Sequence, residues 1–125
     1  MAKIPDSVLR AGERRNTPVV LATVSEDGVP NVIYVTCVGI FDDETIVVAN
    51  NYFDKTLRNI STGSKGALLF ITPEKKAFQI KGTFEYREHG PIFEHMKSWN
   101  PPEHPGHGAA ALKVEEIFSG TERLL

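Results

Sequence analysis

Short runs of β-branched and aromatic residues, most of them separated by tight turns, constrain the fold of this chain more than any other feature. Parallel strands need helical crossovers between them, and the chain has too few helical segments to supply these. The pattern therefore excludes a doubly wound α/β fold and favours a small antiparallel barrel, which removes exposed sheet edges by closing on itself. The six runs are residues 17–25, 31–41, 45–50, 66–72, 77–87 and 109–119.

Three turn sequences indicate how these runs pair. The sequence EDG at 26–28 is a hairpin signal, and DDE at 42–44 makes a second tight connection. We therefore expect the first three runs to form a meander of three strands. The sequence PEKK at 73–76 joins the next two runs, which predicts a further hairpin.

Helix start signals are present in three segments, and they predict two or three short peripheral helices. A mainly β fold with such helices agrees with the spacing of the strand-like runs. The helical segments are residues 6–15, capped by Asp6 or Ser7, residues 54–62, capped by Asp54, and residues 91–99, with Pro91 at the first helical position.

Composition limits the class of protein and its partners. A chain of 125 residues with 41% hydrophobic and 24% charged residues is typical of a single soluble domain, here residues 1–125. Its formal net charge of -2 gives no electrostatic reason to expect nucleic acid or an anionic membrane as a partner. No apolar stretch has the length of a signal peptide or a membrane span, so we expect a cytoplasmic protein.

Neither thiol nor metal chemistry is indicated. Cys37 is the only cysteine, which excludes an intrachain disulfide and a cysteine-rich metal site, and its apolar surroundings predict a small buried hydrophobe. His95, His104 and His107 do not have the helical spacing that aligns metal ligands. We expect no metal, and we expect an exposed loop around the last two histidines.

The segment NNYFDKTLRNI at 50–60 has the residues best suited to bind an anion. The first backbone N–H groups of a helix lack partners within the helix, and Lys55 and Thr56 add an ammonium and a hydroxyl group to that turn. Asp54 acts against this interpretation, because its carboxylate competes for the same N–H groups. An ordinary capped helix with solvated side chains is the alternative, and the local sequence leaves both open.

The sequences ATVSEDGVPNVIYV, DDETIVVANNYFDKTLRNISTGSKGALLF and FQIKGTFEYR occur in this order, and together they resemble the pyridoxamine 5'-phosphate oxidase-like superfamily of FMN-binding split barrels, especially its short FMN-binding branch. The resemblance covers residues 17–87. It implies a six-stranded antiparallel split β-barrel that forms a homodimer, with one FMN at each end of the subunit interface. The second strand of the family lines the flavin ring, and its matching residues are Val32, Ile33, Tyr34 and Thr36.

The resemblance also assigns the remainder of the cofactor site. Ala49, Asn50 and Asn51 match the end of the third strand, which contacts the flavin ring or its ribityl chain. Lys55 and Thr56 match the residues that hold the phosphate. The phosphate anchor therefore coincides with the anion site that the helix start suggests.

Three further residues are predicted to belong to the cofactor site, although they match the family pattern less directly. Asp54 lies where the family often has a hydroxyl group or a histidine, and as a cap it restricts where a phosphate can lie. Gln79 is placed to hydrogen-bond the flavin, with a solvated strand face as the alternative. Trp99 is a candidate lid or stacking residue, with core or interface packing as the alternative.

The function implied is that of an FMN-binding flavoprotein, an oxidoreductase or electron-transfer protein that serves a redox partner or a small-molecule substrate. FMN supplies the redox chemistry itself, so no catalytic side chain is assigned. The alternative is a non-enzymatic flavin carrier, or a split barrel that binds haem or a deazaflavin. A barrel for single-stranded nucleic acid needs a basic groove, which the charge of this chain argues against.

Overall fold

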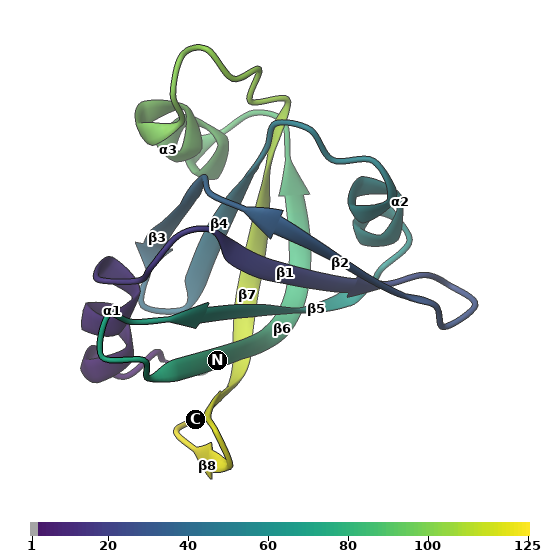
Figure 1. Ribbon diagram of the computed structural model, residues 1–125. Coiled ribbons are helices and arrows are strands. Elements are labelled where there is room, and N and C mark those ends of the chain that lie inside the picture. The colour runs from purple at the N-terminus through teal and green to yellow at the C-terminus, as the bar shows by residue number, and fades with distance from the viewer. Residues whose placement is uncertain (1–2) are drawn as a thin grey trace.

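The structure is a computed structural model that describes residues 3–125. A single antiparallel sheet that curls on itself forms most of it (Figure 1). The strands lie in the order β2-β1-β5-β6-β7-β4-β3, and β8 pairs with β7. The strands are β1 (Val19–Val24), β2 (Pro30–Val35), β3 (Val38–Asp42), β4 (Thr45–Asn50), β5 (Lys65–Ile71), β6 (Ala77–Arg87), β7 (Gly108–Ser119) and β8 (Glu122–Arg123).

The mainly β split barrel expected from the sequence is confirmed, but its sheet has eight strands rather than six. The apolar run 31–41, expected to be one strand, breaks at Thr36 and Cys37 into β2 and β3. β2 pairs with β1 and β3 pairs with β4, so the two halves of the run form opposite edges of the sheet. The predicted meander of three strands is therefore wrong, because a bend in the run converts it into two separate hairpins.

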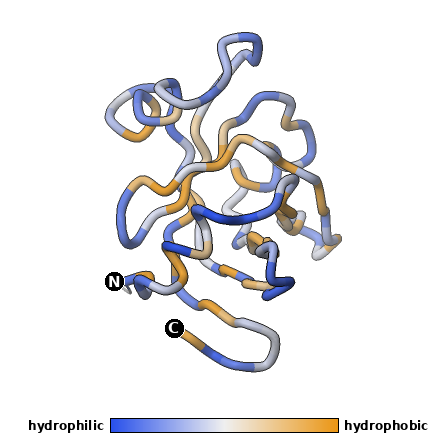
Figure 2. Tube along the Cα trace, turned by 60° about the vertical axis from the view of Figure 1, so that its left-hand side comes forward, coloured by the Kyte–Doolittle hydropathy of each residue, from blue (hydrophilic) through white to orange (hydrophobic). Residues whose placement is uncertain are grey.

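The main core lies inside the curled sheet. Val19, Leu21, Leu68, Ile80 and Leu112 come from four different strands, and each is at most 1% exposed. The strands carry most of the apolar residues, and the connecting loops at the periphery are mainly hydrophilic (Figure 2). This alternation of buried and exposed positions fixes the register of the strands, since a slip by one residue would turn the apolar set outward.

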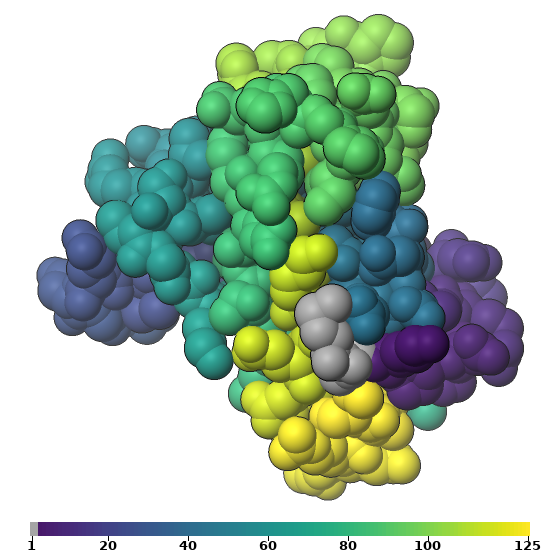
Figure 3. Space-filling view, turned by 180° about the vertical axis from the view of Figure 1, so that it is seen from behind, coloured from purple at the N-terminus to yellow at the C-terminus, as the bar shows by residue number. Residues whose placement is uncertain are grey.

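Helix α3 (Pro91–Trp99) covers the outer face of β4 and β7, and a second, smaller core lies beneath it. Met96 is fully buried there against Val47, Ala49, Ala109 and Ala111. The alanine side chains allow the helix to approach the strands closely. Because both faces of β4 are covered, all six of its residues are buried. Seen from behind, α3 and the C-terminal segment lie at opposite ends of the molecule (Figure 3).

The three helices form at the predicted places, as α1 (Asp6–Glu13), α2 (Lys55–Ser61) and α3. Pro91 lies in the first turn of α3, as expected. The predicted side-chain caps are wrong: neither α1 nor α2 has a capping hydrogen bond from a side chain. The residue before α1 is Pro5, and the Asp54 carboxylate before α2 pairs instead with Arg58, with Oδ1 3.7 Å from Nη2.

Gly82 lies where β6 and β7 shift register, and the backbone of β7 approaches it closely. A Cβ atom at this position would lie 1.9 Å from the carbonyl oxygen of Lys113. That oxygen belongs to the backbone of β7, so it cannot move aside as the tip of a side chain can. The bulge at this point bends the two longest strands and contributes to the curl of the sheet.

We expect Gly82→Ala to lower the free energy of unfolding by about 1–3 kcal/mol, because the two strands must separate to accept the methyl group. Urea unfolding followed by circular dichroism measures this change. Lys81→Ala at the neighbouring exposed position is the matched control, with an effect within about 0.5 kcal/mol. Equal unfolding midpoints for Gly82→Ala and the unmodified protein would contradict the close approach.

Candidate functional site

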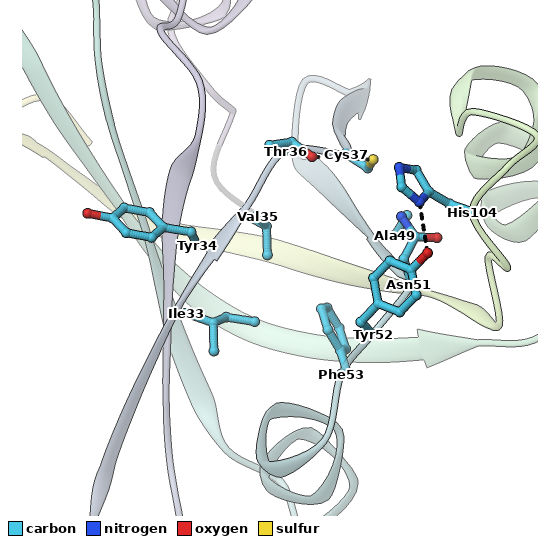
Figure 4. A pocket seen from close by; sticks show the side chains of 10 residues that line it. All are labelled: Ile33, Tyr34, Val35, Thr36, Cys37, Ala49, Asn51, Tyr52, Phe53 and His104. Carbon is cyan, nitrogen blue, oxygen red and sulfur yellow. Dashed lines mark hydrogen bonds between the residues drawn. The ribbon is translucent and has the colours of Figure 1, made fainter.

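A cavity of about 130 Å³ lies at one end of the sheet, where the chain leaves β2 and β4 (Figure 4). No Lys, Arg, Asp or Glu side chain lines it. Five of the residues predicted from the sequence to bind the cofactor belong to its lining, namely Ile33, Tyr34, Thr36, Ala49 and Asn51. The other lining residues are Val35, Cys37, Tyr52, Phe53 and His104.

The walls of the cavity are apolar, and one of them is an edge strand. Ile33 and Val35 alternate along β2 as half-buried side chains that pack against the main core. Tyr34 points away from the other lining side chains and is 75% exposed. β2 is hydrogen-bonded to β1 only, so the backbone groups along its other edge are not used by the sheet. This edge provides backbone donors and acceptors next to an apolar slot.

The buried side chain of Asn50 stabilises the turn after β4 through hydrogen bonds. Its side chain is 2% exposed; Nδ2 donates to Tyr86 Oη at 2.7 Å, and Oδ1 accepts from the Phe53 backbone N–H at 2.9 Å. Its backbone carbonyl accepts from the His107 N–H at 2.9 Å. These bonds commit the Asn50 side chain to the protein interior. The contact with the flavin ring or ribityl chain that is predicted for Asn50 would therefore have to come from its backbone or from neighbouring residues.

Burial raises the pKa of Tyr86 above its ordinary value. The hydrogen bond from Asn50 acts in the opposite direction, and the negative charge of Glu88 raises the pKa further. The phenol is thus held in its neutral form, in which it can accept the bond from the Asn50 amide. This neutral pair contributes to the turn that frames the cavity.

Asn51 joins the cavity to the loop 100–107 after α3. Its Nδ2 donates to Asn100 Oδ1 at 3.0 Å, and Asn100 Nδ2 donates back to Asn51 Oδ1 at 2.9 Å. The same Oδ1 also accepts from the Gly106 backbone N–H at 3.0 Å. Both asparagines are at most 8% exposed. These bonds fix the loop against the end of β4 and bring its residues to the cavity.

His104 is the residue of this loop that reaches the cavity. Its Nδ1 lies 3.1 Å from Tyr52 Oη, and the two rings meet edge to face with centroids 5.6 Å apart. The sequence predicts an exposed loop here, whereas His104 is half-buried. The contact joins residues 52 positions apart, and no local pattern of the sequence indicates it.

The predicted phosphate anchor lies beyond the Phe53 end of the cavity. Lys55 is exposed, whereas Thr56 is only 2% exposed. Thr56 Oγ1 accepts a hydrogen bond from Asn31 Nδ2 at 3.0 Å, which leaves the Thr56 hydroxyl proton available to a further acceptor. Asn31 and Ile33 are two positions apart on β2, so the cavity and the anchor follow the same strand.

Seven of the twelve predicted site residues do not line this cavity, among them Gln79 and Trp99, which do not belong to the predicted phosphate anchor either. Gln79 lies near the start of β6, whereas the cavity is near the end of β4, which pairs with the start of β7. Trp99 packs against β3, where a Cβ atom on Gly39 would lie 2.7 Å from the indole ring. Trp99 thus has a packing contact within the chain, and its lid or stacking role stays a prediction.

An exposed apolar face lies on the outside of β1, β2 and β5. Tyr34 and Leu69 both pair with Val20 and extend to the same side of the sheet, and Val32 and Val24 continue this face. Exposed apolar residues that adjoin one another on a surface often mark an interaction site. The members of this exposed apolar face, with their exposed fractions, are Val24 (37%), Val32 (62%), Tyr34 (75%), Leu69 (41%) and Ile71 (41%).

Residues 3–125 contain no group of three or more His, Cys, Asp or Glu side chains that could hold a metal ion. Within the same range, no helix combines the length and the hydrophobicity needed to cross a membrane.

Sequence comparison with known families decides the family of the chain. The family model described as pyridoxamine 5'-phosphate oxidase matches residues 6–119. The chain belongs to the pyridoxamine 5'-phosphate oxidase family. The superfamily inferred from the sequence is thereby confirmed, and the match extends that resemblance from residues 17–87 to almost the whole chain.

Relatives of this pyridoxamine 5'-phosphate oxidase family protein share both sequence and fold. An uncharacterised protein of Methanocaldococcus jannaschii is 34% identical over 124 residues, covering 91% of this chain and 83% of that one. The crystal structure of a pyridoxamine 5'-phosphate oxidase-like protein of Lactobacillus delbrueckii has a TM-score of 0.78 at 25% identity, with 94% of each chain covered. HupZ of Group A Streptococcus has a TM-score of 0.74 at 25% identity, with 87% of this chain and 86% of that chain covered.

A fourth comparison concerns the fold alone. An FMN-binding protein of Syntrophomonas wolfei has a TM-score of 0.76 at 20% identity, covering 90% of this chain and 82% of that one. The split barrel of this family protein is therefore shared with proteins whose sequences have diverged widely.

We expect Asn51→Ala to destabilise this family protein by about 1–3 kcal/mol, because the Asn100 amide remains buried without its partner. Asn100→Ala should destabilise the protein for the same reason, because it leaves the buried Asn51 amide without its partner. The double variant should cost less than the sum of the two, since removing both partners leaves fewer unsatisfied groups. Urea unfolding of the four proteins measures the coupling, and exposed Asn16→Ala is the control. Strictly additive effects would show that the two amides do not act as a pair.

Proposed function

We propose that this protein binds FMN and acts as a flavoprotein in electron or hydride transfer, with the cofactor bound between two copies of the chain. The observation that carries the proposal is the apolar slot beside the free edge of β2. Membership of the pyridoxamine 5'-phosphate oxidase family supports it. The name of the Syntrophomonas wolfei protein, which states that it binds FMN, agrees with this choice of cofactor.

The residues of the slot fit the chemistry of a flavin ring. An isoalloxazine ring is flat and largely apolar, with polar groups along one edge. Ile33, Val35 and Ala49 provide apolar walls, and the outer edge of β2 provides backbone N–H and C=O groups. Ligand sites commonly combine an apolar lining with a few directed polar groups. When bound, FMN would supply the redox chemistry, and the chain's own residues would bind the ring, orient it and exclude water from one side.

The phosphate would lie beside Lys55 and Thr56. Residues on one strand repeat at about 6.6 Å for every two positions, so a ligand that extends from Ile33 towards Asn31 leaves the apolar slot and approaches this pair. The ammonium group of Lys55 is exposed, and the Thr56 hydroxyl has a proton to donate. A neutral ring site beside β2 and a cationic phosphate site in the first turn of α2 are thus separate.

A second copy of the chain would complete the site. The cavity of about 130 Å³ is smaller than the roughly 300–1,000 Å³ of ordinary ligand pockets, so one chain offers only part of the enclosure. The exposed apolar face begins at Tyr34 and Val32 on the same strand that lines the cavity. If this face packed against a second copy of the chain, the same contact would cover the exposed apolar residues and close the cavity.

We expect Lys55→Ala to weaken FMN binding about ten- to hundredfold, because one charge-assisted contact to phosphate is lost. Fluorescence titration of FMN with the purified protein measures the dissociation constant. Lys76→Ala on the distant β5–β6 turn is the matched control, with unchanged affinity. Thr56→Ser keeps the hydroxyl group and should retain binding. An absorbance spectrum without flavin bands, with another cofactor identified by mass, would contradict the choice of FMN.

The exposed apolar face gives a second prediction. Val32→Glu introduces a charge there and should convert a dimer into a monomer that binds FMN more weakly, since each copy then retains only part of the site. Sedimentation velocity at micromolar concentration measures the mass, and Ser7→Glu on exposed α1 is the control for added charge. A monomeric Val32→Glu protein with unchanged FMN affinity would rule out a shared site.

A further inference from the structure

His104 lines the cavity from the loop that follows α3, whereas every other lining residue lies within residues 33–37 or 49–53. Sequence resemblance assigns no role to this histidine. The loop that carries it is fixed rather than free, because Asn51 binds both Asn100 and the Gly106 N–H. The His104 backbone N–H itself donates to the Pro101 carbonyl at 3.0 Å. The position of the imidazole at the cavity is therefore built into the fold.

Tyr52 determines how the imidazole is presented. Its hydroxyl group lies 3.1 Å from His104 Nδ1 and engages that ring nitrogen. The other ring nitrogen, Nε2, has no hydrogen-bond partner among residues 3–125, and in Figure 4 it is directed towards Thr36 and Cys37 on the far side of the cavity. When the Tyr52 O–H donates to Nδ1, the ring proton lies on Nε2. The pair then offers one N–H donor to the cavity.

We propose that His104 donates a hydrogen bond from Nε2 to the ring system of the bound flavin, and that Tyr52 fixes the imidazole for this contact. The inference rests on the proposed function, because it names the ligand of the same cavity. An oxidised flavin ring has two carbonyl oxygens on its polar edge, which are suitable acceptors. The lining contains no cationic side chain, so this directed N–H is the strongest donor that the loop adds to the site.

Riboflavin distinguishes a contact to the ring from a contact to the phosphate, because it has the same ring and no phosphate. His104→Phe keeps a flat aromatic cover but removes the donor. We expect it to weaken the binding of FMN and of riboflavin by the same factor, about two- to tenfold. Lys55→Ala should weaken the binding of FMN alone. Fluorescence titrations with both ligands measure the four changes in dissociation constant.

Three further variants separate the hydrogen bond from packing. His104→Gln retains a side-chain N–H donor and should restore much of the affinity that His104→Phe loses. Tyr52→Phe should weaken binding in the unmodified protein but have no further effect in His104→Phe, because Tyr52 acts through the imidazole. His107→Phe, at an exposed position of the same loop, is the control. The absorbance bands of bound flavin should shift in His104→Phe and not in His107→Phe.

The possible outcomes distinguish the two proposals. If the unmodified protein binds flavin, and His104→Phe binds FMN and riboflavin with the same dissociation constants as the unmodified protein, the contact from His104 is overturned. The proposed function then remains. If His104→Phe weakens FMN but not riboflavin, the imidazole contacts the phosphate and the inference is wrong. If the unmodified protein binds neither ligand, the proposed function and this inference both fail.

Discussion

The reciprocal hydrogen bond between the Asn51 and Asn100 side chains holds the candidate site together. Each buried carboxamide offers a donor and an acceptor, and the pair satisfies one of each while Gly106 uses a further lone pair. In a buried environment such groups are costly when unpaired, so the arrangement has little freedom to change. It joins the end of β4 to the end of α3 and to the loop before β7. The position of His104 depends on all three.

A second constraint is the bend at Thr36 and Cys37. Because the apolar run breaks there, its first half becomes the edge strand β2 and its second half becomes the opposite edge β3. The break leaves β2 with an unpaired backbone edge, and it also places residues 36 and 37 in the cavity lining. A continuous strand through this point would have had neither feature. The split in the barrel and the candidate site therefore have the same structural origin.

Local patterns in the sequence were sufficient for the helices and for the hairpins, whereas the residues of β2 and β4 at the cavity were predicted from the family resemblance. Ile33 and Ala49 could be assigned because strand order and spacing survive in the family resemblance. Cys37 and His104 could not, since the first depends on a bend inside an apolar run and the second on contacts across 49 to 55 residues. Asn50 shows a different limit. A polar residue at a strand end suggests a ligand contact, but here Tyr86 and Phe53 occupy its side chain.

The uncharged cavity lining and the exposed Lys55 of α2 separate two tasks in the proposed site. Because the cavity lining has no Lys, Arg, Asp or Glu, a charged ligand group gains no ionic partner inside it, and burial there would be unfavourable. Lys55 lies outside, in solvent, where a phosphate keeps much of its hydration while it gains a cationic neighbour. The ring slot can therefore select a flat, uncharged ring by shape and hydrogen bonding, and the exposed lysine can increase affinity without affecting that selection. Thr56 connects the two, since it follows Lys55 in the first turn of α2 and its hydroxyl group accepts a hydrogen bond from Asn31 of β2.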